Sequence, residues 1–294
     1  MNGFIDLIKP PGLSSGGAVA AVKRLTGEKV GHAGTLDPEA SGVLPIMVGR
    51  ATRLLNFFSE KEKTYIAEIS FHGATDTQDA QGEIIEKGCG KPEHQDFLRV
   101  LDEMTGEIDQ CPPAYSALKR DGTPLYKLAR QGIEVKTEAR KTWIYAIDVL
   151  GETEDGYMIR VQCGGGTYIR TLCHDIGQKL HHPAHMKFLL RTQVGIFDIE
   201  NGVTLEQLQE AKENGTLEAC ILPMDEPLGH LHRIDVPAKF TKQVLNGVAL
   251  PAEWLNAKET DGPCTIYLND DLIGIARNVD GFMKFHVIVK NYAD

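Results

Sequence analysis

A single carboxylate, Asp37, lies in a glycine-rich bend between two apolar runs, within residues 31–45. Pro38 follows it, and a proline disfavours helical geometry in the residue before it, so we expect Asp37 in an extended or turn conformation. Loops held between rigid elements often carry catalytic groups, and a carboxylate can act as a nucleophile. The same residues could instead begin a helix, with Asp37 as N-cap and Pro38 at the first helical position. Spacing alone favours the helix start.

A second segment places a cation after a glycine turn. Residues 157–163 alternate like a strand, three glycines follow at 164–166, and a helix is predicted over 167–180. Glycines allow close backbone approach and a helix N-terminus attracts anions, so Arg170 could belong to a site. A plain turn with Arg170 on a helix surface is the competing interpretation. The pattern is neither G-x-G-x-x-G nor a Walker loop, so it does not support a nucleotide cofactor.

Cysteine and histidine usage does not indicate a metal site. The six cysteines contain no C-x-x-C pair, which speaks against a zinc ribbon and a redox motif and is typical of reduced thiols in a cytoplasmic protein. Residues 181–185 hold three histidines, but Pro183 spoils a helical ligand pair, so a loop is expected. The N-terminal residues lack a signal-peptide pattern, and no apolar run reaches the roughly 20 residues that span a bilayer.

The net charge of −10 argues at first against a nucleic-acid partner. The charges are unevenly distributed, however, because basic stretches at 1–65, 113–147 and 157–197 alternate with acidic ones. Screening confines each patch to about 10 Å, so a local basic face on an acidic protein can bind phosphates. Ordinary solvated faces are the alternative explanation.

Periodicity and turn signals predict the elements that must position these residues. Helices are expected over 18–25, 97–104, 167–180, 241–245 and, after a Thr204–Gln207 capping box, to about residue 214. Strands are expected over 63–71, 141–150, 157–163 and 233–236, with a hairpin turn at 279–282 between 272–276 and 283–289. Residues 110–140 predict a protruding, mobile excursion. A boundary is expected at 228–233, followed by a small β-barrel.

Taken together, these segments resemble the tRNA pseudouridine-55 synthase (TruB) family. The matching residues are Lys9-Pro10-x-Gly12-x-Ser14-Ser15, Gly31-His32-x-Gly34-Thr35-Leu36-Asp37-Pro38-x-Ala40-x-Gly42-Val43-Leu44-Pro45, Lys63-x-Tyr65, Thr75-Asp76-Thr77-x-Asp79-x-x-Gly82, Pro112-x-x-Tyr115-Ser116-Ala117-Leu118-Lys119, Tyr126-x-x-Ala129-Arg130-x-Gly132 and Gly166-Thr167-Tyr168-Ile169-Arg170-Thr171-Leu172. The set covers residues 4 to about 230, and the tail, 231–294, resembles a PUA domain. Ile8 and Gly164-Gly165 depart from the family pattern but flank its motifs.

The resemblance implies an α+β fold: a mixed, largely antiparallel sheet flanked by helices, with a central RNA-binding cleft and a small C-terminal, PUA-like β-barrel. It divides the chain into a catalytic domain, 1–230, with an RNA-clamping insertion at about 110–140, and an RNA-binding domain, 231–294. The implied activity is isomerisation of uridine 55 in the T-arm loop of tRNA to pseudouridine, with base flipping. No water is added and no redox change occurs, so no cofactor or metal is expected.

The resemblance also assigns roles to residues. Asp37 is the catalytic carboxylate, Arg170 pairs with it and keeps it ionised, and Tyr65 stacks on the extruded uracil near C5. Whether the carboxylate attacks the sugar or assists elimination at the ribose stays open. The expected substrate-binding residues are His32, Tyr168, Leu189, Asp79, Lys9, Lys119 and Arg130.

Two other functions are compatible with parts of the sequence. One is a tRNA-folding chaperone with secondary catalysis, which the basic excursion and the barrel would serve equally. The other is the guide-RNA-dependent relative, which shares the catalytic motif. The excursion at 110–140 favours the stand-alone bacterial type, so we expect a monomeric cytoplasmic enzyme whose partner is the tRNA T-arm, with no guide RNA and no membrane.

Overall fold

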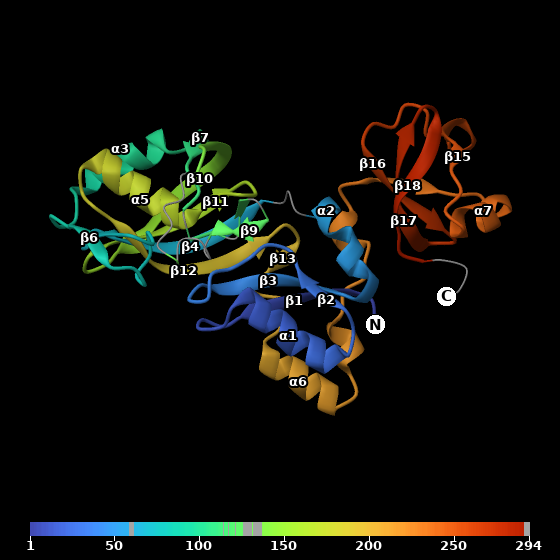
Figure 1. Cartoon of the computed structure of the whole chain (residues 1–294), viewed down its shortest axis with the longest axis horizontal. Coiled ribbons are helices and arrows are strands. Elements are labelled where there is room, and N and C mark those ends of the chain that lie inside the picture. Colours follow the sequence, from blue (N-terminus) through green and yellow to red (C-terminus); the bar gives the residue numbers. More distant parts are fainter. Residues whose placement is uncertain are drawn as a thin grey trace.

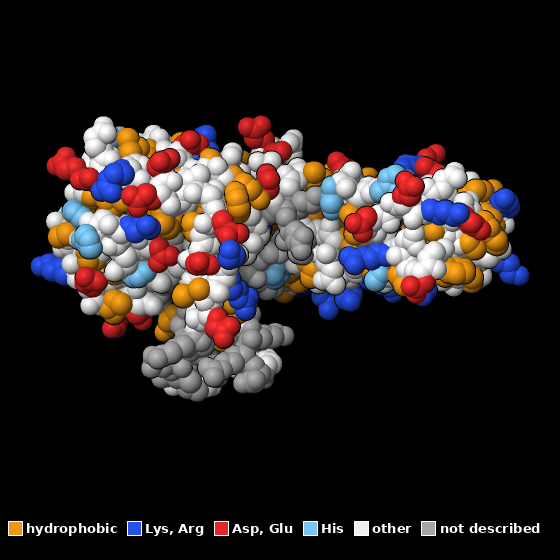
Figure 2. All heavy atoms as spheres, turned by 90° about the horizontal axis from the view of Figure 1, so that it is seen from above, with side chains coloured by type: hydrophobic (Ala, Val, Ile, Leu, Met, Phe, Trp, Pro, Cys, Tyr) orange, Lys and Arg blue, Asp and Glu red, His pale blue; other side chains and the backbone are white. Residues whose placement is uncertain are grey.

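The computed structural model describes residues 1–58, 62–113, 115–116, 118–120, 122–125, 131 and 137–290. The molecule is elongated, with a larger mixed α/β body at one end and a smaller β-rich unit at the other (Figure 1). On the face shown in Figure 2, positive and negative side chains interleave over both units. No helix in the described ranges is long and apolar enough to cross a membrane.

A twisted sheet forms the centre of the larger body. Its order is β1-β3-β12-β4-β11-β10-β7, with β2 paired to β3 and β13 paired to β12. The strands are β1 (Gly3–Lys9), β2 (Val30–His32), β3 (Ser41–Val48), β4 (Lys63–Ser70), β7 (Gly106–Gln110), β10 (Arg140–Glu152), β11 (Gly156–Cys163), β12 (His185–Val194) and β13 (Phe197–Asp198). All of these pairings are antiparallel except β12 with β3. The predicted mixed, largely antiparallel sheet is confirmed.

Four longer helices pack on this sheet. Helices α1 (Ser15–Thr26) and α6 (Leu205–Glu213) contact each other beside β1 and β2, and α3 (His94–Glu103) and α5 (Ile169–Leu180) contact each other beside the far half of the sheet (Figure 1). Their apolar faces join one core with Ala67 and Ile69 of β4. The predicted capping box opens α6, because the Thr204 hydroxyl accepts from the Gln207 amide N–H and the Gln207 side chain accepts from the Thr204 N–H.

Short elements connect these parts. They are η1 (Gly49–Leu54), α2 (Leu55–Phe58), β5 (Gly73–Thr75), β6 (Ile84–Lys87), β8 (Lys119–Arg120), β9 (Thr123–Pro124), η2 (Leu217–Cys220) and η3 (Glu226–Leu228). β5 pairs with β6, and β8 pairs with β9. Within the predicted excursion at 110–140, residues 114, 117, 121, 126–130 and 132–136 lie outside the described residues.

The smaller unit is a five-stranded sheet in the order β14-β16-β17-β18-β15. Its elements are β14 (His232–Asp235), η4 (Ala238–Phe240), α7 (Thr241–Leu245), β15 (Leu250–Pro251), η5 (Ala252–Leu255), β16 (Pro263–Leu268), β17 (Asp271–Val279) and β18 (Phe282–Ile288). Asp280 and Gly281 both have positive φ, as a tight hairpin turn requires, so the predicted hairpin is confirmed. Leu272 and Ile275 share a hydrophobic cluster with Phe4 and Phe197 of the larger body, which docks the two units together.

The prediction of a helix beginning at Asp37 is wrong. Residues 35–40 form an irregular loop in which the Ala40 N–H donates to the Asp37 carbonyl over 3.2 Å. The Pro38 carbonyl, which such a helix would use, instead accepts from the Lys9 ammonium over 3.0 Å. The Ser15 hydroxyl fixes the residue before Asp37, because it exchanges hydrogen bonds of 2.9 Å with both the N–H and the carbonyl of Leu36. Tertiary contacts therefore override the local helix-start signal.

Candidate active site

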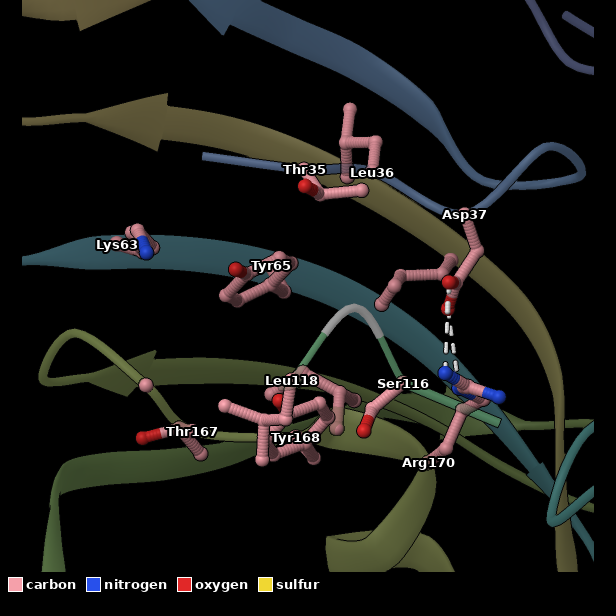
Figure 3. Close-up of a pocket in the computed structure, with 13 residues that line it drawn as sticks. Thr35, Leu36, Asp37, Lys63, Tyr65, Ser116, Leu118, Thr167, Tyr168 and Arg170 are labelled. Atoms are coloured by element: carbon pink, nitrogen blue, oxygen red, sulfur yellow. Dashed lines mark hydrogen bonds and ion pairs between the residues drawn. The ribbon is translucent and has the colours of Figure 1, made fainter. Parts of the chain in front are cut away.

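A cavity of about 300 Å³ opens beside the loop that carries Asp37. It is lined by Thr35, Leu36, Asp37, Lys63, Tyr65, Ser116, Leu118, Gly166, Thr167, Tyr168, Ile169, Arg170 and Leu189. Asp37 and Arg170 lie at one end, Lys63 at the other, and Tyr65 between them (Figure 3). Segments far apart in the sequence, on β4, β12, α5 and three loops, thus meet at one concave site, which is the usual location of a ligand pocket.

Asp37 and Arg170 form a two-point ion pair. Arg170 Nε lies 3.0 Å from Asp37 Oδ2, and a second guanidinium N–H donates to Oδ1 over 3.4 Å (Figure 3). The Arg170 side chain is only 6% exposed, whereas Asp37 is 38% exposed. The cation is therefore held within the protein and presents the carboxylate to the cavity. The structure brings together the two residues that the resemblance pairs, although 133 positions separate them.

The guanidinium of Arg170 is fixed on its other sides as well. It lies 3.3 Å from Asp79 Oδ2 and donates to the carbonyl of Tyr115 over 2.9 Å. Asp79 is itself oriented, since its Oδ1 accepts from the Thr77 hydroxyl over 2.6 Å and from the Gln81 N–H over 3.0 Å. We expected Asp79 to bind substrate. The structure places it outside the cavity lining, where it orients Arg170.

The pKa of Asp37 is set by opposing effects. Burial has the largest effect and raises the pKa of this carboxyl, and the charge of Asp79 raises it further. The cations Arg170 and Lys9 lower it, and the net result is a raised pKa. The expectation that Arg170 keeps Asp37 ionised is therefore only part of the balance. Arg170 acts in that direction, but desolvation acts more strongly in the other.

The loop that carries Asp37 is anchored by a buried lysine. Lys9 is fully buried. Its ammonium donates to the carbonyls of Pro10, Leu13 and Pro38 over 2.8, 2.7 and 3.0 Å. An ammonium has three N–H donors, so none remains for a substrate. The expectation that Lys9 binds substrate is corrected accordingly: it holds the backbone next to Asp37.

The middle of the cavity is bordered by aromatic and aliphatic side chains. Tyr65 on β4 is 6% exposed and Leu189 on β12 is 7% exposed, and both face the cavity. Tyr168 precedes α5, and its backbone N–H and carbonyl both hydrogen-bond the Gln110 side chain, over 3.0 and 3.1 Å. Burial raises the pKa of both phenols, so they are neutral near pH 7.

The remaining expected residues lie elsewhere. His32 on β2 does not line the cavity as the described residues define it, and its Nδ1 is buried without a described partner. Burial and the neighbouring Arg191 charge lower its pKa, so the imidazole is neutral. Arg130 and the side chain of Lys119 fall outside the described residues.

Sequence reasoning missed several residues at the site. Lys63 and Thr167 line the cavity, and Arg191 lies fully buried behind it. Lys63 carried a signal, because it lies two residues before Tyr65 on a predicted strand and must share its face. Within the described ranges, no group of three or more His, Cys, Asp or Glu side chains is placed to hold a metal ion.

Comparison with known proteins places this site in a family. The N-terminal domain model of the TruB family pseudouridylate synthases matches residues 23–169, and the tRNA pseudouridylate synthase B C-terminal domain model matches residues 170–229. The chain belongs to the TruB family. It is 42% identical to the tRNA pseudouridine synthase B of Geobacillus thermodenitrificans, over 90% of each chain, and 40% identical to that of Alkaliphilus oremlandii, over 99% of this chain and 98% of that one.

Two solved structures share the fold. A chain of a Cbf5-Nop10-Gar1 complex is 27% identical, with a TM-score of 0.75 over 99% of this chain and 86% of that one. A chain of an H/ACA ribonucleoprotein bound to a substrate RNA is 26% identical, with a TM-score of 0.73 over 98% of this chain and 84% of that one. The match spans both units of this molecule.

Proposed function

We propose that this chain isomerises uridine 55 in the T-arm loop of tRNA to pseudouridine. One observation carries the proposal: the partly exposed carboxylate of Asp37, held by the buried Arg170, faces a cavity with a neutral aromatic floor. Membership of the TruB family supports this chemistry, and the curated relatives at 40–42% identity are named tRNA pseudouridine synthase B.

The reaction breaks the C1′–N1 glycosidic bond, turns the uracil and forms a C1′–C5 bond, after which the proton at C5 leaves. In the proposal, Asp37 acts as a carboxylate on the ribose, as carboxylates do in glycosidases. Arg170 aims it and Asp79 aims Arg170. Tyr65 lies against the uracil and its hydroxyl serves the C5 proton. Leu189 and Tyr168 enclose the detached base.

The target uridine must leave the RNA fold to reach this cavity, which costs a few kcal/mol. His32, outside the cavity, is proposed to occupy the space that the flipped base vacates. The basic stretch at 113–147, which includes Lys119 and Arg130, is proposed to contact phosphates of the T-arm, because such contacts position RNA without reading its sequence.

We further propose that residues 1–230 form the catalytic domain and that 231–294 form a PUA-like RNA-binding domain. The five-stranded sheet of the smaller unit and its own hydrophobic cluster support that division. We propose a monomeric cytoplasmic enzyme without a guide RNA. In support, the chain is 40–42% identical to relatives named tRNA pseudouridine synthase B and 26–27% identical to the chains from the Cbf5-Nop10-Gar1 and H/ACA complexes.

Release of label from uridine tests the proposed activity. An unmodified tRNA transcript with tritium at uridine C5 is incubated with the wild type and with Asp37→Asn, which keeps the side-chain shape but removes the charge. The wild type should release the label and the variant should not. An inactive wild type would refute the isomerase, whereas a fully active variant would refute the role of Asp37. Refolding of misfolded tRNA in the same samples measures the chaperone alternative separately.

A further inference from the structure

The end of the cavity opposite Asp37 is positively charged. Lys63 begins β4 and lines the cavity on the same strand face as Tyr65 (Figure 3). Arg191 on β12 lies directly opposite Tyr65 in the sheet register. A methyl group added at Gly34 would be 3.7 Å from Arg191 Nη1 and 3.8 Å from Lys63 Nζ. The two cations are therefore close neighbours.

Arg191 is an unusual buried group. It is 1% exposed, and its guanidinium donates to backbone carbonyls at Val43 over 2.7 Å, Gly34 over 3.1 Å and Thr35 over 3.4 Å. The neutral Tyr65 hydroxyl is a side-chain hydrogen-bond partner of the same guanidinium. Buried arginines are normally paired with a carboxylate. Among the described residues, neither Arg191 nor Lys63 forms a salt bridge. A positive charge thus remains uncompensated at this end.

The titratable neighbours do not cancel that charge. Lys63 faces Cys163 across the β4–β11 pairing, and burial raises the pKa of the Cys163 thiol to about 11, so it is neutral. Burial likewise keeps Tyr65 and His32 uncharged. Burial and Arg191 lower the pKa of Lys63. Because Lys63 lines the cavity, its ammonium can gain a partner there that would favour its charged form.

The proposed reaction generates a matching negative charge. If the ribose lies at Asp37 and the base against Tyr65, as proposed above, Lys63 at the far end of the cavity would face an edge of the uracil. When the C1′–N1 bond breaks, its electron pair stays on the uracil and spreads over N1, O2 and O4. When C5 then bonds to C1′, the C5 proton is lost and N1 regains a proton, so the charge exists only between those two steps.

We propose that Lys63 is a catalytic residue that stabilises the uracil anion as the glycosidic bond breaks, and that Arg191 is a positioning residue behind it. This inference rests on the proposed isomerase function. A fixed charge placed where charge develops stabilises the transition state more than the ground state. Lys63 therefore acts on the rate of bond cleavage rather than on tRNA affinity. A phosphate of the RNA backbone is the competing partner for such a cation.

Charge removal at Lys63 gives the first test. Lys63→Gln is compared with Lys63→Arg, which keeps the charge, and with Lys187→Gln as a control, since Lys187 is an exposed lysine that pairs with Glu68 on the opposite face of β4. In single-turnover assays with saturating enzyme, Lys63→Gln should be about 10²-fold slower than the wild type with a similar tRNA Kd, and Lys63→Arg should recover part of the rate. Thermal unfolding checks that each variant is folded.

The leaving group gives the second, sharper test. A tRNA with 5-fluorouridine at the target carries a base whose anion is already stabilised by the fluorine, so it needs Lys63 less. The slowing caused by Lys63→Gln, measured as consumption of the parent nucleotide, should shrink to no more than about tenfold. Equal slowing with both bases, an effect on Kd alone, or no effect would overturn the inference. An inactive wild type would instead refute the proposed function.

Discussion

Replacing Lys9 by methionine tests whether this residue holds the loop that carries Asp37 or binds RNA. Methionine keeps most of the length but removes the donors to three carbonyls. Each buried carbonyl left without a donor costs about 1–3 kcal/mol. Three such carbonyls cost about 6 kcal/mol at the middle of that range. Removing the buried ammonium recovers several kcal/mol of desolvation, so we expect a net loss of about 3 kcal/mol. That corresponds to a Tm lower by roughly 5–10 °C.

The same substitution should slow catalysis without weakening RNA binding. The carbonyl of Pro38 is one of the three acceptors, and it belongs to the residue next to Asp37. A displacement of about 1 Å at a catalytic group can cost about 10²-fold in rate. Single-turnover kinetics and differential scanning calorimetry measure the two effects. Lys23→Met, at an exposed site on α1, is the control for loss of a charge. An unchanged Tm with a weaker, less salt-dependent tRNA affinity would refute the structural role.

Three further predictions follow from the site and its supports. Asp79→Asn removes a charge that raises the pKa of Asp37, so the acid limb of the pH–rate profile should move to lower pH. The maximal rate should fall, because Asp79 no longer orients Arg170. An acid limb that does not move would contradict the electrostatic balance. Tyr65→Phe keeps the ring, so tRNA Kd should stay constant while C5 tritium release slows about 10²-fold; normal release would exclude the hydroxyl from proton transfer. Gly42→Ala would place a methyl against a backbone carbonyl of β12 at φ +104°, so it should unfold at a clearly lower temperature, whereas Gly164→Ala, with only ordinary contacts, should not.

Local patterns predicted the regular elements because their causes are local. The alternation that begins at Lys63 defines β4, and the Thr204–Gln207 capping box marks the start of α6. At Asp37 the expected turn is confirmed and the helix-start interpretation is wrong, because the backbone there is held by Ser15 and Lys9, which lie more than 20 positions away. A helix-start pattern contains no information about such partners.

The site could be predicted only in part for a similar reason. The pairing of Asp37 with Arg170 came from resemblance to a family, since nothing in the spacing of residues so far apart indicates contact. The sequence predicts Lys9 as a substrate ligand, since a residue type does not reveal whether its donors are already used by backbone carbonyls. The sequence around Arg191 does not indicate its proposed positioning role. That role depends on the absence of a carboxylate partner among its described neighbours, which only the fold reveals.

The most direct test of the central claim is the nucleoside composition of tRNA after a single turnover. An unmodified transcript is incubated with excess enzyme, digested and separated, and the modified position is mapped in a parallel sample. The wild type should convert one uridine per molecule to pseudouridine, in the T-arm loop, while Asp37→Asn should bind the transcript and leave every uridine intact. Pseudouridine formed by Asp37→Asn, or none formed by the wild type, would contradict the account.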